Sequence, residues 1–230
     1  EQKDAVGHAV CNMYLMCGAT DVAAETGDQS LLDAMHTLWD SVTLRRMYIT
    51  GGIGSCDAGE RFTFDYDLPN ENAYNETCAS IGLVFWADRM LQFGADRKYS
   101  DIMEKALYNG IISGLSLSGD HFFYANHLAS NNGIYQNKVQ RNNRMRPDRQ
   151  QWFRVSCCPP NLARLTASIG GYIYSQNEKE IDQHLFIDSC AELQVAGEKV
   201  QILQKTEYPW DEKVHITINP ENPCEFVYTV

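Results

Sequence analysis

The sequence predicts a mainly α chain with an all-β part at its C-terminal end. Up to about residue 180, apolar residues recur every three or four positions, which is the spacing of one helix face. Beyond that point they alternate at every second position, between turn residues such as Gly197, Pro209 and Asn219. We therefore divide the chain into a helical part, residues 1–180, and a β part, residues 181–230.

The first part is expected to hold a succession of helices with short connections, like stacked helical hairpins. Gly18 is a point where the first helix is interrupted or recapped, and Ser30 is the expected N-cap of the second. The last helix begins at a double proline, where a missing N–H costs nothing. The expected helices cover 3–25, 30–47, 77–93, 99–115 and 160–174.

Two connections stand out between these helices. The glycine-rich segment 48–55 predicts a backbone that approaches another group closely or adopts positive φ. Residues 119–155 show no clean period and are expected to be loop, with a short strand at 121–125. In the β part, strands are expected over 184–187, 191–195, 200–205, 214–218 and 225–230.

Composition narrows the class of protein. The 230 residues are 44% hydrophobic and 21% charged, as in globular proteins with a sizeable core, and the net charge is −11. This acidic balance argues against nucleic-acid binding, and we interpret the basic cluster at 141–149 as a solvated loop. The sequence contains no run of 18 apolar residues and no signal-peptide pattern, so no transmembrane helix, no membrane partner and no signal peptide are expected in these residues. The chain lacks an initiator methionine, and we expect it to be part of something longer.

The eight cysteines fall into two groups. Five stand singly among apolar or turn residues and are interpreted as small buried hydrophobes: Cys11, Cys17, Cys56, Cys190 and Cys224. The other three have polar company. Cys78 follows Glu76 in a stretch rich in acids and aromatics, and Cys157 adjoins Cys158 ahead of Pro159 and Pro160.

These three thiols and one carboxylate are a candidate zinc site. Three thiolates and one carboxylate complete a tetrahedral Zn²⁺ site. Side chains one or two positions apart on a regular helix point in different directions, so Glu76 with Cys78, and Cys157 with Cys158, can bind one ion only from irregular backbone. We expect Glu76 and Cys78 just before one helix, and the two adjacent cysteines in a loop before another. The spacing matches no standard zinc finger, so purely structural cysteines stay an open alternative.

Three segments carry a resemblance to a known family. In this order, YITGGIGS, GERFTFDYDLPNENAYNETCASIG and CCPPNLARL resemble glycoside hydrolase family 127, the β-L-arabinofuranosidase family. The tail, with QHLFIDS and KTEYPWDEKVHITINPENP, is similar to the family's β segment. The resemblance implies the later part of an (α/α)6 barrel, without its first helices, followed by the start of a β-sandwich domain.

The resemblance also implies a role for individual residues. Glu60 would be the general acid/base, and Cys157 the nucleophile. His8 and Tyr124 would contact the sugar. Zinc would be held by Glu76, Cys78, Cys157 and Cys158. The sequence departs from the family at Asn126-His127 and at Arg154-Val155-Ser156, which puts substrate preference in doubt more than mechanism.

Elementary chemistry agrees with these roles. A retaining glycosidase needs a proton donor and a nucleophile, and a thiolate serves as the nucleophile if zinc keeps it deprotonated. Glu60 must start protonated, and we expect Phe62, Phe64 and Tyr66 to favour its neutral form. The partner is then a carbohydrate, specifically a terminal arabinofuranoside, and a working thiolate favours a cytoplasmic location. Whether the protein is a homo-oligomer stays open.

Other interpretations remain beside this one. A relative could cleave another uncommon plant-polysaccharide sugar, or the chain could be a structural zinc-binding helical module. Taken singly, Glu60 is a solvated loop acid, His8 a core histidine on a helix face, and Tyr124 a core aromatic residue. Half a barrel leaves a pocket open, so we expect this chain alone to be inactive.

Overall fold

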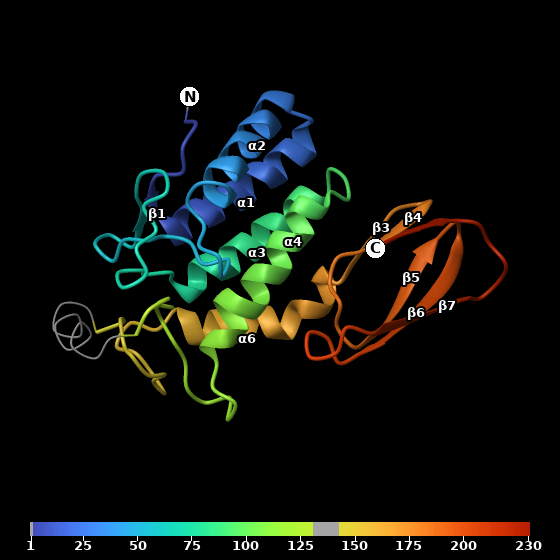
Figure 1. Cartoon of the computed structure of the whole chain (residues 1–230). Coiled ribbons are helices and arrows are strands. Elements are labelled where there is room, and N and C mark those ends of the chain that lie inside the picture. The colour runs from blue at the N-terminus through green and yellow to red at the C-terminus, as the bar shows by residue number, and fades with distance from the viewer. Residues whose placement is uncertain (1, 131–142) are drawn as a thin grey trace.

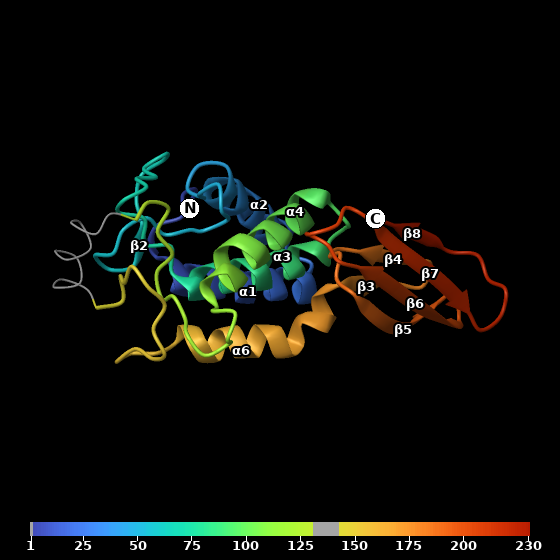
Figure 2. The ribbon, with the colours of Figure 1, turned by 60° about the horizontal axis from the view of Figure 1, so that its bottom comes forward.

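The computed structural model describes residues 2–130 and 143–230. It confirms the two predicted classes of structure: helices fill the first part, and strands gather at the C-terminal end (Figure 1). Figure 2 shows the helices lying beside one another, with the strands extending from one end of the helical layer. The predicted loop at 131–142 and the basic residue Arg141 lie outside the described residues.

The helical part consists of five α-helices and three short segments of other helix types within the described residues. The α-helices are α1 (Ala9–Thr26), α2 (Gln29–Thr43), α3 (Thr77–Leu91), α4 (Arg97–Lys105) and α6 (Cys158–Ser168). A π-helix at Ala106–Ile111 and a 3-10 turn at Ile112–Gly114 continue α4, and a 3-10 turn at Ile169–Tyr172 continues α6. None of these helices combines the length and apolarity that a membrane span requires.

Helix α3 is the centre of this part. All but two of its side chains, those of Asp88 and Arg89, are buried, because α1, α4 and α6 all pack against it. Gly82 permits the close approach of α1, since a Cβ there would lie 2.7 Å from the Cβ of Met13. On the other flank Trp86 meets Trp39 of α2 edge-on, with ring centroids 5.0 Å apart.

Two helix starts differ from the prediction. Helix α1 begins at Ala9, because Gly7–His8 form a short strand, β1, that pairs with β2 at Arg61–Phe62. Gly18 does not interrupt α1. The N-cap of α2 is Asp28, whose carboxylate accepts the backbone N–H groups of Ser30 and Leu31, so the assignment of Ser30 was wrong.

The β part forms two three-stranded sheets. One contains β3 (Tyr174–Gln176), β4 (Glu180–Gln183) and β8 (Val227–Thr229), with β4 parallel to β8. The other is an antiparallel meander of β5 (Ser189–Val195), β6 (Glu198–Thr206) and β7 (Val214–Pro220). The sheets share a small core of Ile181, Val195, Val200 and Ile202.

The sequence misplaced the first strands of this part. The expected strand at 184–187 is wrong, since β4 covers Glu180–Gln183, and β3 occupies residues assigned to the end of the last helix or left unassigned. Residues 181–185 are all buried, so no in–out alternation marks the strand there. Strand pairing begins at Tyr174, and the division at 180/181 stays a prediction. The expected strand at 121–125 is reduced to isolated bridges of Phe122 and Ala125.

Tyr208 is one of the residues through which the β part contacts the helical part. The hydroxyl of Tyr208 donates to Glu104 of α4 at 2.8 Å. The Tyr208 ring also packs edge-on against Tyr108 and Phe186, with centroids 6.0 and 5.8 Å away. Glu104 and Tyr108 are four positions apart and lie on one face of the helical segment, so both contact Tyr208 in the loop between β6 and β7.

Candidate active site

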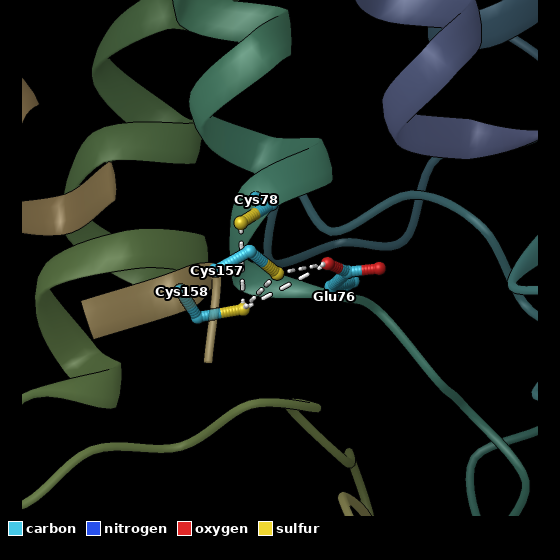
Figure 3. Close-up of side chains that lie close together, drawn as sticks. All are labelled: Glu76, Cys78, Cys157 and Cys158. Carbon is cyan, nitrogen blue, oxygen red and sulfur yellow. Dashed lines mark hydrogen bonds between the residues drawn. The ribbon is translucent and has the colours of Figure 1, made fainter. Parts of the chain in front are cut away.

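Four of the predicted site residues converge at the first turns of two helices. Glu76 is the N-cap of α3 and Cys78 is the second residue of that helix. Cys157 is the N-cap of α6 and Cys158 is its first residue. The expectation of irregular backbone was therefore only half right. Each pair straddles the boundary where loop becomes helix, and this turns both side chains to one side (Figure 3).

The separations in this cluster suit a metal ion. One donor atom from each residue lies within 4.8 Å of the others. The sulfur of Cys158 is 3.5 Å from that of Cys78 and 3.8 Å from that of Cys157. Cys157 Sγ and Cys158 Sγ lie 3.2 and 3.8 Å from Glu76 Oε1. Tetrahedral ligands at a metal–sulfur distance of about 2.3 Å stand about 3.8 Å apart, so the donor set has the size and chemistry of a metal site.

The pKa values of the cluster place one negative charge on Cys157. Hydrogen bonds from the thiols of Cys158 and Cys78 hold the pKa of Cys157 far below that of an ordinary thiol. Burial raises the pKa of Cys158, and hydrogen bonding to Cys157 raises that of Cys78. Burial, with the nearby charge of Cys157, raises the pKa of Glu76 to about 8. A cation would favour release of the remaining protons, because it stabilises each anionic donor.

Tyr124 joins this cluster from the loop after the π-helix. Its hydroxyl lies 3.0 Å from the sulfur of Cys157, and burial raises its pKa, so the phenol is the donor. The backbone carbonyl of Tyr124 accepts the N–H of Thr77 at 2.9 Å, which fixes the loop to the start of α3. The ring is buried against Tyr74 and Phe153.

Glu60 and His8 form a second group of donor atoms with Glu76. Donor atoms of the three residues fall within 4.8 Å of one another, and His8 Nε2 is 3.6 Å from Glu60 Oε2. Glu60 occupies a turn with φ of 51°, and its carbonyl accepts the N–H of Ala9 at 2.8 Å. His8 lies in β1 and is half-exposed, so it is not a core histidine of a helix face. Glu76 thus adjoins both the thiols and the candidate acid/base.

The expected surroundings of Glu60 were wrong for two of the three aromatic residues, since Phe62 is buried but the other two are not. Phe64 and Tyr66 are 73% and 71% exposed, and their rings do not enclose the carboxyl group. Its partners are His8 and the guanidinium of Arg144, which forms an ion pair with Glu60 Oε1. The guanidinium also lies 4.9 Å from the ring centroid of Tyr124. Arg144 thereby connects the acid/base candidate to the tyrosine that touches Cys157.

Arg144 is the residue that the sequence analysis missed. It belongs to the basic cluster that was interpreted as a solvated loop, yet its side chain is 21% exposed. Its neighbour Met145 is buried in the same cluster as Tyr124. Backbone hydrogen bonds of 2.8 and 2.9 Å between Phe122 and Gln150 tie this loop to the Tyr124 loop. In the sequence, the apolar Met145 within this basic cluster is a local signal that one face of the loop is buried.

The single cysteines are mostly not core residues. Cys17 is buried, which confirms that prediction, but Cys11 and Cys190 are exposed, and Cys56 and Cys224 are half-buried. Cys157 is also exposed, and with Cys78 it borders an open cleft of about 310 Å³. Tyr14, Asn161 and Arg164 line the same cleft and hydrogen-bond to one another. The thiol cluster is therefore reachable from outside.

The comparison with known proteins agrees with the site. The model of the β-L-arabinofuranosidase GH127 catalytic domain matches residues 1–171, and that of the GH127 middle domain matches 180–229. The chain belongs to this family. GH127 membership confirms the resemblance and identifies the chain as part of a glycoside hydrolase family.

Individual relatives show how much of a GH127 protein the chain represents. It is 40% identical over 221 residues to the "Non-reducing end beta-L-arabinofuranosidase" of Bifidobacterium longum subsp. longum, covering 95% of this chain and 33% of that protein. A GH127 β-L-arabinofuranosidase structure from Geobacillus stearothermophilus T6 superposes with a TM-score of 0.91 at 52% identity, covering 96% and 34%. Another GH127 β-arabinofuranosidase structure gives 0.85 at 42% identity, covering 94% and 32%. The chain spans about a third of the length of these relatives.

Proposed function

We propose that the protein carrying this chain is a retaining glycoside hydrolase that releases terminal β-L-arabinofuranose from a carbohydrate. The relatives described above are β-L-arabinofuranosidases, which supports the substrate. The observation that supports the chemistry is the position of Glu76, which lies within 4.8 Å of donor atoms of the thiols and of Glu60. A nucleophile and a proton donor facing one pocket are what retention requires.

Zn²⁺ is the ion that the donor set fits best. Three soft sulfurs and one carboxylate oxygen select zinc over magnesium or calcium, which prefer oxygen donors. Glu76, Cys78, Cys157 and Cys158 would hold it. When bound, Zn²⁺ supplies positive charge that keeps the cysteine sulfurs deprotonated at neutral pH.

The chain's own residues carry out both steps. In the first, Cys157 Sγ forms a bond to the anomeric carbon, the glycosidic C–O bond breaks, and Glu60 gives its proton to the departing oxygen. In the second, the Glu60 carboxylate takes a proton from water, whose oxygen bonds to the anomeric carbon as the C–S bond breaks. The thiolate is regenerated, and two inversions give net retention.

His8, Tyr124 and Arg144 prepare the site for these steps. His8 is half-exposed beside Glu60 and is positioned to hydrogen-bond a sugar hydroxyl. Tyr124 donates to the Cys157 sulfur and so orients the nucleophile. Arg144 holds Glu60 in its ion pair before substrate arrives, and Glu60 must leave this pair to act as an acid.

A structural zinc module is the second candidate, and the match of residues 1–171 to a catalytic-domain model favours the catalytic role. We also propose that residues 1–180 form the later part of an (α/α)6-barrel catalytic domain, and 181–230 the start of a β-sandwich domain. The two family models, which meet between residues 171 and 180, support this division. A cytoplasmic location is likewise proposed from the free thiolate chemistry.

The test uses the full-length protein, an activated aryl β-L-arabinofuranoside and zinc analysis. We expect one zinc per chain in the wild type, and loss of turnover in Cys157→Ala and Glu60→Gln. Glu60→Gln should retain zinc and accumulate a pentosyl adduct on Cys157, detectable by mass spectrometry, because it lacks the base for the second step. Cys190→Ala changes an exposed cysteine of β5 and serves as the control. Zinc bound with activity intact in both site variants would leave only a structural site.

A further inference from the structure

The carboxylate of Glu76 uses only one of its two oxygens toward the thiols. Oε1 lies 3.2 Å from Cys157 Sγ, whereas Oε2 has no hydrogen-bond partner among the described residues. Glu76 is 3% exposed, so water does not compensate this oxygen freely. Figure 3 shows Oε2 directed away from the three sulfurs. A buried carboxylate oxygen without a partner indicates a missing ligand.

Two further donors stand within reach of Glu76. One donor atom each from His8, Glu60 and Glu76 lies within 4.8 Å of the others. His8 Nε2 and Glu60 Oε2 are 3.6 Å apart, close to the about 3.4 Å that separates nitrogen and oxygen ligands around a tetrahedral ion. The ion pair with Arg144 engages the other oxygen, Oε1, so Oε2 of Glu60 remains directed to His8.

We propose that His8, Glu60 and Glu76 form a second divalent-cation site, distinct from the thiolate site and joined to it by the Glu76 carboxylate. One imidazole and two carboxylates suit Zn²⁺, Co²⁺ or Mn²⁺ rather than the softer cations that thiolates alone would select. The inference rests on the proposed zinc site, because that site determines the charge of its surroundings.

Charge favours this second cation. Three thiolates and one carboxylate outweigh one divalent ion by two negative charges, and Arg144 already neutralises Glu60. The loaded centre would therefore keep an excess negative charge among buried and half-buried side chains, which a second divalent ion neutralises. Since His8 and Glu60 are also the proposed sugar contact and acid/base, a cation bound there excludes substrate. The second site is thus inhibitory.

The test counts metals with Co²⁺ as the probe on the full-length protein stripped of metal. The first equivalent should produce sulfur-to-cobalt charge-transfer absorption, and the second should bind without increasing it. His8→Ala and Glu60→Gln should each weaken the second equivalent by about tenfold or more while the thiolate absorption persists. In the wild type, Zn²⁺ beyond one equivalent should raise KM for the aryl arabinofuranoside and leave kcat unchanged.

His121→Ala is the matched control. His121 and Asp120 form an exposed pair 2.7 Å apart, which offers the same donor types at the surface. Loss of the second equivalent in His121→Ala would show an adventitious ion only and overturn the proposal. Binding that is unaffected by His8→Ala and Glu60→Gln, or no second equivalent up to about 1 mM, would overturn it equally. Absence of the thiolate absorption would instead contradict the zinc site of the proposed function. The effect of His8→Ala on Co²⁺ binding would then decide separately whether His8, Glu60 and Glu76 hold a cation.

Discussion

Replacement of Arg46 by methionine removes the guanidinium that ties the segment after Glu60 to helix α2. The side chain of Arg46 is 8% exposed and pairs with Asp65 at 2.6 Å and Asp4 at 3.4 Å. Its Nε donates to the carbonyl of Thr63 at 3.0 Å, and Nη1 donates to Ser41. Methionine fills a similar volume but supplies none of these hydrogen bonds.

Burial sets the expected magnitude. Removing one member of a buried charged pair costs about 3 kcal/mol, because the remaining groups stay desolvated without a partner. Asp65 is 39% exposed and keeps Arg45 as a partner at 3.3 Å, so the loss of unfolding free energy in Arg46→Met should not exceed about 3 kcal/mol. Arg45→Met is the matched control, since Arg45 has the same two aspartate partners but is 34% exposed. Its pairs are surface pairs, worth about 0.5 kcal/mol.

Equilibrium urea unfolding of the full-length protein measures both changes. We expect Arg46→Met to lower the free energy of unfolding by about 2 kcal/mol more than Arg45→Met does. Because Thr63 follows the Glu60 turn, Arg46→Met should also lower kcat while zinc content stays at the wild-type level. Equal destabilisation by the two substitutions would refute the argument that burial determines the cost.

Three further outcomes follow from single contacts. Burial lowers the pKa of His184 to about 4, so the unfolded chain binds more protons at this residue between pH 6.5 and 4. The unfolding free energy of the wild type relative to His184→Asn should therefore fall by about 3 kcal/mol as pH decreases across that window in pH-dependent melts, and a pH-independent difference would contradict the assignment. Gly51→Ala should cost at least about 2 kcal/mol in thermal unfolding, because the new Cβ would lie 2.9 Å from the Ala106 backbone, whereas Gly27→Ala, with positive φ but open space, should cost about 1 kcal/mol; equal costs would contradict the steric reason. Arg144→Met should lower kcat at unchanged zinc content and Arg144→Lys should restore part of it, while unchanged turnover in Arg144→Met would exclude a positioning role.

Local patterns predicted most of the helical part because they act within one element. The buried face of α2 and the continuous apolar run of α3 can be recognised from the residues of each helix alone, and both helices lie within a few residues of the expected bounds. The misses have causes outside the element. Gly7–His8 leave the helix pattern because β2 pairs with them, and β4 lacks alternation because successive residues on both of its faces are buried.

The identity of the metal-ligand candidates also came from sequence, but through the resemblance rather than through spacing. Cys157 and Cys158 are 79 and 80 residues away from Cys78, so no local pattern indicates that the three share a site. Whether segments that far apart in the chain meet depends on how the helices between them pack. Tertiary structure shows that the first turns of α3 and α6 meet there, and that Glu76 faces both the sulfurs and Glu60.

Residue types, helix periods and family motifs were thus properties of the sequence alone. The ion pair of Arg144 with Glu60, the exposure of Phe64 and Tyr66, and the unpartnered oxygen of Glu76 were decided only by tertiary structure. The physical reason is that burial and charge neighbourhood depend on segments distant in the chain, whereas helix capping and amphipathic spacing depend on residues within a few positions.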